Sequence, residues 1–163
     1  MELEARARAL RLAIFDVDGV MTDGTLYIGA AGEAFKAFNI LDGHGVKMLH
    51  SAGVATAILS GRSSEAVDRR AAELGIRHVI QGAEDKVAAY EELRSRLGVE
   101  ASACAFVGDD LPDLPVMRLC GFAVAVANAV EPVKSAAHYV TRVAGGRGAV
   151  REFCDLVLRA REK

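Results

Sequence analysis

The sequence predicts an α/β protein with a doubly wound, mostly parallel sheet and a β-hairpin inserted after the first strand. Short apolar runs alternate with longer segments of helical periodicity along most of the 163 residues. Most of these runs are apolar throughout, which is typical of central parallel strands covered on both faces. No linker, repeat or low-complexity tract interrupts the pattern. We therefore expect a single domain over residues 1–163.

The predicted elements are bounded by capping and turn residues. Serine or aspartate precedes two of the helical segments, and glycine follows both of them. Strands are predicted at residues 12–15, 55–59, 78–80, 103–107, 122–126 and 138–141. Helices are predicted at residues 63–75, 85–98 and 148–161.

One segment, residues 24–39, breaks the alternation of strands and helices. Its sequence, GTLYIGAAGEAFKAFN, predicts two short strands around a glycine-containing turn. The side chains of Leu26, Ile28, Phe35 and Phe38 would be exposed on an isolated hairpin. We expect them to pack against another subunit.

Composition narrows the possible classes of protein. Twenty Lys and Arg residues face 22 Asp and Glu residues, so no broad positive field indicates binding to nucleic acid or to a membrane. The N-terminal segment lacks the apolar core of a signal peptide, and no run is long enough to span a membrane. The cysteines Cys104, Cys120 and Cys154 are far apart and predict reduced core residues of a cytoplasmic protein.

Two acidic clusters follow predicted strands directly. Asp16 and Asp18 come after the first strand, where residues two apart in an extended chain point the same way. Asp109, Asp110 and Asp113 come after the fourth. In parallel α/β sheets ligands bind beyond the carboxyl ends of strands, and crowded carboxylates need a cation or a shared proton. Hard oxygen ligands favour Mg²⁺.

Two further elements suit phosphoryl transfer. Ser60 and Arg62 follow another apolar strand and offer a hydroxyl and a guanidinium for an anion. Lys86 lies near the start of a predicted helix, where its charge can neutralise a phosphate.

The ordered set DVDGVMTDG, LSGR, Lys86 and GDDLPD resembles the four motifs of the haloacid dehalogenase superfamily. KAFNILDGHGVKML and YVTRVAGGRGAVREFCDLVL further resemble its phosphatases of 3-deoxy-D-manno-octulosonate 8-phosphate. The resemblance implies a haloacid dehalogenase-like fold and a capless, Mg²⁺-dependent phosphatase that acts through an aspartyl-phosphate. It also implies a homotetramer built through the hairpins and a role in lipopolysaccharide biosynthesis.

The resemblance also implies roles for individual residues. Asp16 is the expected nucleophile, and Asp18 the expected acid and base. Asp16, the backbone carbonyl of Asp18 and Asp109 are the expected metal ligands, while Ser60 and Lys86 hold the phosphoryl oxygens.

The remaining expected site residues surround this centre. Asp110 and Asp113 are expected to orient the metal ligands. The glycine-rich residues 144–148 open the C-terminal tail and helix, 144–163, and predict a mobile arm. The resemblance implies that this arm reaches a neighbouring active site, where Arg147 contacts substrate or aids product release. The expected substrate contacts are Asp18, Asn39, Ile40, Leu41, Asp42, Gly43, Lys47, Arg62, Arg70 and Lys86.

Three alternatives stay open at this point. The same motifs serve phosphatases of nine-carbon keto-acid 9-phosphates, which are similar to sialic acid 9-phosphate. A phosphoacceptor signalling domain shares the α/β build, but its accepting aspartate ends the third strand, so the order of motifs here opposes it. A non-catalytic homologue is disfavoured because Asp16 and Asp18 are both present.

Overall fold

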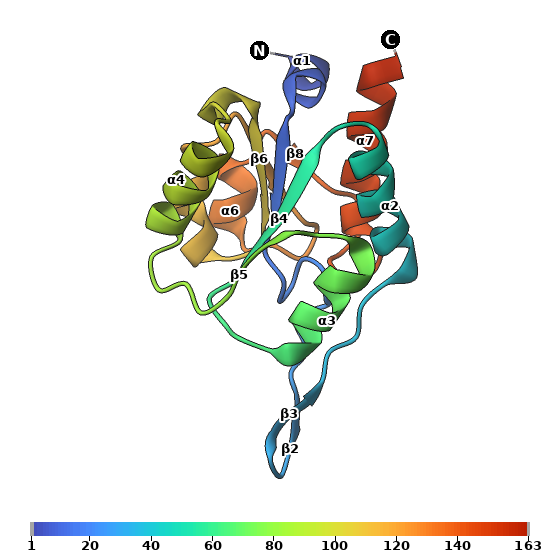
Figure 1. Ribbon diagram of the computed structural model, residues 1–163, viewed down its shortest axis with the longest axis vertical. Coiled ribbons are helices and arrows are strands. Elements are labelled where there is room, and N and C mark those ends of the chain that lie inside the picture. Colours follow the sequence, from blue (N-terminus) through green and yellow to red (C-terminus); the bar gives the residue numbers. More distant parts are fainter. Residues whose placement is uncertain (1, 163) are drawn as a thin grey trace.

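A parallel sheet lies at the centre of the molecule, between two layers of helices (Figure 1). The computed structural model describes residues 2–162. Within these residues the sheet has six strands in the order β5-β4-β1-β6-β7-β8, and every neighbouring pair is parallel. Its strands are β1 (Leu12–Phe15), β4 (Ala55–Leu59), β5 (His78–Ile80), β6 (Cys104–Gly108), β7 (Phe122–Ala125) and β8 (Tyr139–Val140).

Helices α2 and α7 cover one face of the sheet, and α4 and α6 cover the other (Figure 1). This arrangement confirms the predicted doubly wound α/β fold. The helices are α1 (Leu3–Ala9), α2 (Ile40–Ser51), α3 (Glu65–Leu74), α4 (Lys86–Leu97), α5 (Leu114–Met117), α6 (Glu131–Ala136) and α7 (Ala149–Glu162), with 3₁₀ turns η1 (Ala101–Ala103) and η2 (Leu111–Asp113).

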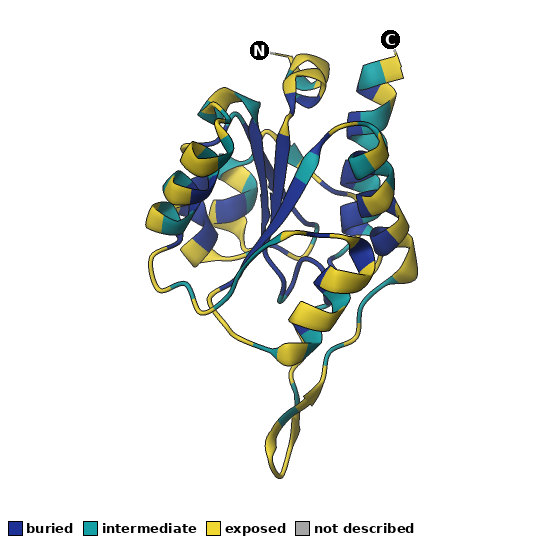
Figure 2. Ribbon diagram, in the orientation of Figure 1, coloured by how far each residue is buried: buried dark blue, intermediate teal, exposed yellow. Residues whose placement is uncertain are grey.

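Apolar side chains fill the space between the layers. The central strands β1, β6 and β7 are buried along their whole length (Figure 2). Phe153 of α7 packs edge-on against Phe15 of β1, with ring centroids 5.9 Å apart. It also contacts Phe122 of β7 at 5.8 Å. The predicted core position of the cysteines is confirmed: Cys104, Cys120 and Cys154 are buried and free.

Helix α2 was not delimited by sequence, because two glycines lie inside it. Gly45 faces α7, and a Cβ at Gly45 would lie 3.1 Å from the Cβ of Cys154. The absence of a side chain therefore lets the two helices approach closely, which offsets the low helix propensity of glycine.

The predicted hairpin is present as β2 (Tyr27–Gly29) and β3 (Gly32–Phe35), two antiparallel strands that project from the body (Figure 1). Leu26, Ile28 and Phe35 are exposed, as expected for an isolated hairpin. Phe38 differs from the prediction: it is half-buried and packs against the core, and the guanidinium of Arg70 lies over its ring. The reason is that Phe38 follows the hairpin, where the chain returns to the body.

The glycine-rich segment 144–148 also differs from its prediction. Instead of forming an arm that leaves the molecule, it packs against the loop after β1. Its Gly145 amide donates to Asn128 Oδ1 at 2.7 Å, and its Gly146 amide donates to the Val20 carbonyl at 3.1 Å. Glycine serves here for close packing, since Gly145 is buried.

None of the helices described is both long and apolar enough to cross a membrane.

Candidate active site

The site begins at the carboxyl end of β1, the strand between β4 and β6. The Asp16 amide donates to the carbonyl of Val107 at 3.1 Å, so Asp16 continues the strand pairing one residue beyond β1. Its side chain is held by the Val17 amide, which donates to Asp16 Oδ1 at 2.8 Å. Because β1 is buried on both faces, Asp16 sits at the edge of the core and is only 8% exposed.

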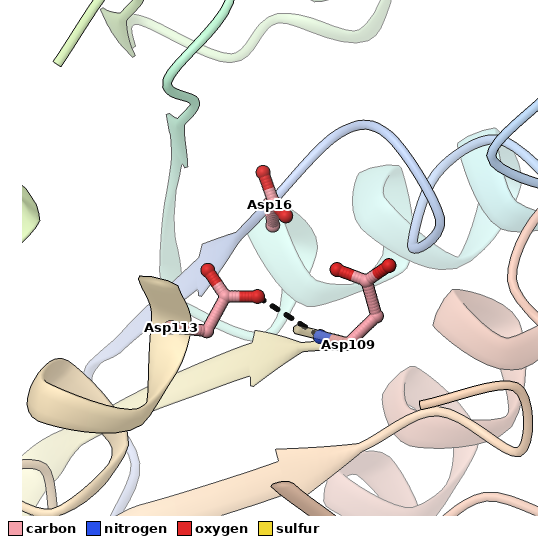
Figure 3. Close-up of side chains that lie close together, drawn as sticks. All are labelled: Asp16, Asp109 and Asp113. Atoms are coloured by element: carbon pink, nitrogen blue, oxygen red, sulfur yellow. Dashed lines mark hydrogen bonds between the residues drawn. The ribbon is translucent and has the colours of Figure 1, made fainter. Parts of the chain in front are cut away.

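The second acidic cluster meets Asp16 from the end of β6. Asp109 follows this strand, and turn η2 brings the Asp113 side chain back beside it (Figure 3). Asp113 Oδ2 accepts hydrogen bonds from the amides of Asp109 at 2.9 Å and Asp110 at 3.3 Å. The Asp110 carboxylate instead caps η2, accepting from the Leu111 amide at 2.7 Å. Asp113 therefore fixes the backbone that carries Asp109.

Lys86 places a positive charge beside Asp16 and Asp113, one carboxylate from each acidic cluster. It is the first residue of α4, after the capping residue Asp85, and is nearly buried. Its Nζ lies 2.7 Å from Asp113 Oδ1 and 3.3 Å from Asp16 Oδ1. Burial works to lower the pKa of Lys86, but the carboxylates of Asp16 and Asp113 outweigh it and raise that pKa. The ammonium therefore stays charged beside the nucleophile candidate.

Ser60 and Arg62 complete the pocket from the end of β4. The Ser60 amide donates to the Ile80 carbonyl at 2.9 Å, which extends the pairing of β4 with β5. Ser60 is buried, whereas the Arg62 side chain is half exposed at the rim. The pocket has a volume of about 200 Å³ and is lined by Asp16, Asp18, Ser60, Gly61, Arg62, Lys86, Asp109, Asp110, Pro112 and Asp113.

The carboxylates in this pocket hold their protons unusually strongly. Burial, followed by repulsion from Asp113, raises the pKa of Asp16 to about 6. Burial and the nearby charges of Asp16 and Asp113 raise the pKa of Asp109 to about 8. Both shifts reflect burial first, and then the repulsion between carboxylates that are crowded together.

The donor set fits a hard divalent cation. Carboxylate oxygens of Asp16, Asp109 and Asp113 all lie within 4.8 Å of one another. Asp113 is engaged with Lys86 at 2.7 Å and with two backbone amides, whereas Lys86 lies further from Asp16, at 3.3 Å. Asp16 and Asp109 are therefore the pair whose negative charges are least compensated. Oxygen ligands of this kind suit Mg²⁺.

Lys36 and Glu33 contact residues of the site, but no pattern in the sequence identified them. Lys36, just after β3, donates from Nζ to Asp18 Oδ1 at 2.7 Å and to Glu33 Oε2 at 3.0 Å. Arg62 joins the group, with Nε 3.5 Å from Asp18 Oδ2 and NH2 3.2 Å from Glu33 Oε2. No spacing rule links residues 18, 33 and 36, because they meet only in the folded chain, where the end of the hairpin and the loop after β1 come together.

Several predicted substrate contacts do not line this pocket. Asn39 caps α2 by accepting from the Leu41 amide, and Ile40, Leu41 and Lys47 are exposed. Arg70 donates to the Asn39 carbonyl at 3.3 Å. These residues stay predicted substrate contacts, at a distance from the acidic cluster within the same chain.

Asp42 and Gly43, from the same predicted set, face the interior. Asp42 is buried and accepts at 2.9 Å from the Arg151 amide in the first turn of α7, so it ties α2 to α7. Burial raises the pKa of Asp42 to about 6. Gly43 is packed against Arg70, since a Cβ there would lie 2.4 Å from NH2 of that guanidinium. This packing places both residues in the scaffold rather than on an open surface.

Arg147 lies outside the pocket as well. Its NH2 group is 3.6 Å from Asp23 Oδ2, and its side chain is 71% exposed. A separate hollow of about 700 Å³ lies near the amino ends of β4 and β5, among residues that include His50, Thr56 and Arg77. None of the described residues that line it is acidic, so the carboxylate chemistry belongs to the smaller pocket.

Comparison with known proteins matches residues 78–153 to the haloacid dehalogenase-like hydrolases. A 3-deoxy-D-manno-octulosonate 8-phosphate phosphatase of Yersinia pestis is 50% identical over 158 residues, covering 97% of this chain and 84% of the relative. The phosphatase of the same name from Escherichia coli K12 is 48% identical over 159 residues, covering 98% of this chain and 85% of its own.

Solved structures agree. The Yersinia pestis enzyme superimposes with a TM-score of 0.96 at 49% identity, covering 99% of this chain and 87% of that one. The phosphatase of Moraxella catarrhalis, in complex with magnesium, phosphate and KDO, gives a TM-score of 0.95 at 45% identity, covering 98% and 91%. The chain therefore belongs to the haloacid dehalogenase-like hydrolases and, among them, to the family of the 3-deoxy-D-manno-octulosonate 8-phosphate phosphatases.

Proposed function

We propose that this protein hydrolyses 3-deoxy-D-manno-octulosonate 8-phosphate to 3-deoxy-D-manno-octulosonate and phosphate, as a step of lipopolysaccharide biosynthesis. One observation carries the proposal: Asp16 and Asp109 share a small pocket with Lys86 and Ser60 at the carboxyl ends of three neighbouring strands. The close relatives named for this reaction support the choice of substrate.

The residues of the pocket have distinct roles in this reaction. A carboxylate oxygen of Asp16 attacks phosphorus, and the bond from phosphorus to the sugar oxygen breaks. Asp18 gives its proton to the leaving sugar oxygen. Water then attacks the phosphorus of the aspartyl-phosphate, Asp18 takes the proton of this water, and phosphate leaves Asp16 with both carboxylate oxygens restored. Lys86 and Ser60 hold the phosphoryl oxygens through both steps.

The same pocket would hold a magnesium ion between Asp16 and Asp109, with the backbone carbonyl of Asp18 as a further ligand. When bound, the ion supplies positive charge beside the phosphoryl group and relieves the repulsion between the two carboxylates. Asp113 and Lys86 would hold these ligands in place, because they contact the backbone of Asp109 and the side chain of Asp16.

We also propose that the hairpins join four chains into a homotetramer. Ile28 and Phe35 expose 65% and 56% of their surface, and Leu26 exposes 45% on the same projecting element. Because about half of each side chain is still exposed, burying the rest between subunits stabilises an assembly by about 1 kcal/mol each.

The first experiment measures phosphate release in the presence of Mg²⁺ from 3-deoxy-D-manno-octulosonate 8-phosphate, a nine-carbon keto-acid 9-phosphate and simple hexose phosphates. We expect kcat/KM to be highest for the eight-carbon ester. Preference for the nine-carbon ester would keep the mechanism and replace the substrate. Absence of turnover with every ester would leave only a non-catalytic role.

Replacing the nucleophile tests the covalent step. Asp16→Asn should lower kcat by on the order of 10³-fold or more, because the amide cannot form the aspartyl-phosphate. Circular dichroism should show an intact fold, since the amide can still accept from the Val17 amide. If the purified variant turned over at a rate near that of the wild type, Asp16 would not be the nucleophile.

Raised carboxyl pKa values make magnesium binding pH-dependent. In the metal-free folded protein Asp16 and Asp109 keep protons up to about pH 6 and pH 8, whereas both ionise near pH 4 when unfolded. The folded state thus binds more protons across this range, and the stability contributed by these groups falls as pH rises. Mg²⁺ competes with those protons, so its stabilising effect should grow from pH 5.5 to pH 8.5.

Thermal unfolding with EDTA and with excess Mg²⁺ measures this effect. Each tenfold gain in affinity adds about 1.4 kcal/mol of stabilisation. The control Asp109→Asn should remove the growth with pH. A stabilisation by Mg²⁺ that is equal at every pH would contradict binding at this pair.

The assembly can be tested on the hairpin. Ile28→Ser should reduce the mass in solution from four times the 17.3 kDa of one chain to that of a smaller species, because each copy loses apolar contact area. Leu119→Ser is the matched control, since Leu119 is 45% exposed on the body of the molecule. Sedimentation analysis would refute the hairpin interface if both variants sedimented like the wild type.

A further inference from the structure

A turn after β7 contacts the backbone of both loops that carry the carboxylate pair. Asn128 in this turn donates from Nδ2 to the carbonyl of Gly19 at 3.0 Å, which lies in the loop that carries Asp16 and Asp18. Two residues later, the Val130 amide donates to the carbonyl of Asp109 at 2.9 Å. The turn therefore spans the gap between the two loops whose carboxylates must approach each other.

Gly145 packs against the same loop and is also linked to it through Asn128. Its amide donates to Asn128 Oδ1 at 2.7 Å, so the Asn128 side chain links Gly145 to Gly19. A Cβ placed on Gly145 would lie 1.9 Å from the Gly19 carbonyl oxygen, and therefore no other residue fits there without moving the loop.

The contact continues from Gly19 to the acidic pair. A Cβ on Gly19 would lie 2.0 Å from Asp109 Oδ2, which means that the Gly19 backbone rests directly against the Asp109 carboxylate. Gly145, Gly19 and Asp109 thus form one line of close contacts. A displacement at Gly145 therefore reaches the carboxylate through one contact between backbones and one contact between the Gly19 backbone and the Asp109 side chain.

The segment that carries Gly145 is itself anchored. Thr141 Oγ1 donates to the Val143 carbonyl at 2.7 Å and accepts from the Ala127 amide at 3.1 Å. The Glu152 carboxylate on α7 accepts from the amides of Arg142 at 2.9 Å and Val143 at 3.2 Å. Helix α7 and the turn after β7 therefore hold the segment that carries Gly145 in place, so that Gly145 can resist movement of the loop.

We propose that Asn128 and Gly145 are positioning residues, which set the separation between the Asp16–Asp18 loop and Asp109 and thereby the affinity of the pocket for a divalent cation. This inference rests on the proposed function, since it assumes that the pair binds metal. Two carboxylates without a cation repel each other, and a loop restrained only at β1 would relax away from Asp109. The contacts of Asn128 and Gly145 with this loop keep the carboxylate ligands close together before a cation binds.

The experiment compares Gly145→Ala with Gly121→Ala. A Cβ on Gly121 would lie 2.2 Å from the Ser102 carbonyl oxygen, a clash like that at Gly145, but at the amino end of β7. Neither glycine has a positive φ, so the two substitutions differ mainly in location. Metal-stripped proteins are titrated with Mn²⁺, which accepts the same oxygen ligands as Mg²⁺, and the free ion is counted by electron paramagnetic resonance.

We expect Gly145→Ala to weaken Mn²⁺ binding by roughly 10- to 100-fold, as loss of support behind metal ligands does elsewhere. Gly121→Ala should lower the melting temperature and leave the dissociation constant within about twofold of the wild type. In turnover assays of Gly145→Ala, raising Mg²⁺ should restore much of the lost kcat. Equal Mn²⁺ affinity in folded Gly145→Ala and wild type would overturn the inference.

Asn128→Ala provides a second test of the inference if Gly145→Ala does not fold. Asn128 is exposed, so its truncation removes the link without adding an atom to a packed region. It should weaken Mn²⁺ binding in the same direction by a smaller factor, and unchanged affinity would count against the inference. Wild-type protein that binds no Mn²⁺ would instead overturn the proposed metal site itself, so the two failures are distinguishable.

Discussion

The approach of Asp16 to Asp109 is the constraint on which the rest of the site depends. Both carboxylates are largely removed from water and carry raised pKa values, so the fold holds them together against their repulsion. The sheet makes this possible: β1 and β6 are adjacent, parallel and buried, and their pairing continues to Asp16. Lys86 compensates part of the negative charge of the carboxylates. The negative charge that remains favours binding of a divalent cation.

This constraint explains how much of the structure could be predicted from sequence. Apolar runs with no polar alternation predict buried parallel strands, and parallel strands bring their carboxyl ends to one edge. Hence Asp16, Asp109, Ser60 and Lys86 could be assigned to one site, and the pocket does contain them all. These inferences succeed because they depend on local pattern and on the topology of the sheet.

Features that depend on contacts between distant segments were missed or misjudged. The Asn128 link and the Lys36 pair with Asp18 join residues about 110 and 18 positions apart, and no periodicity encodes such pairs. Residues 144–148 looked flexible because they contain three glycines, yet Gly145 is where a Cβ cannot fit. A glycine has the same appearance in sequence whether it serves mobility or close packing, and only its neighbours in space decide between the two.

The hairpin shows how a projecting element can still be fixed at its base. The Lys36 side chain is only 4% exposed, and burying an ammonium is costly unless strong partners replace water. Asp18 and Glu33 provide them at 2.7 and 3.0 Å, and Arg62 bridges the same two carboxylates from the β4 side. Lys36 and Glu33 therefore tie the hairpin to the acid and base candidate of the site, while its apolar side chains Leu26, Ile28 and Phe35 stay exposed. A subunit that packed on these apolar side chains would contact an element that also holds Asp18, and assembly would then be coupled to the position of that carboxylate.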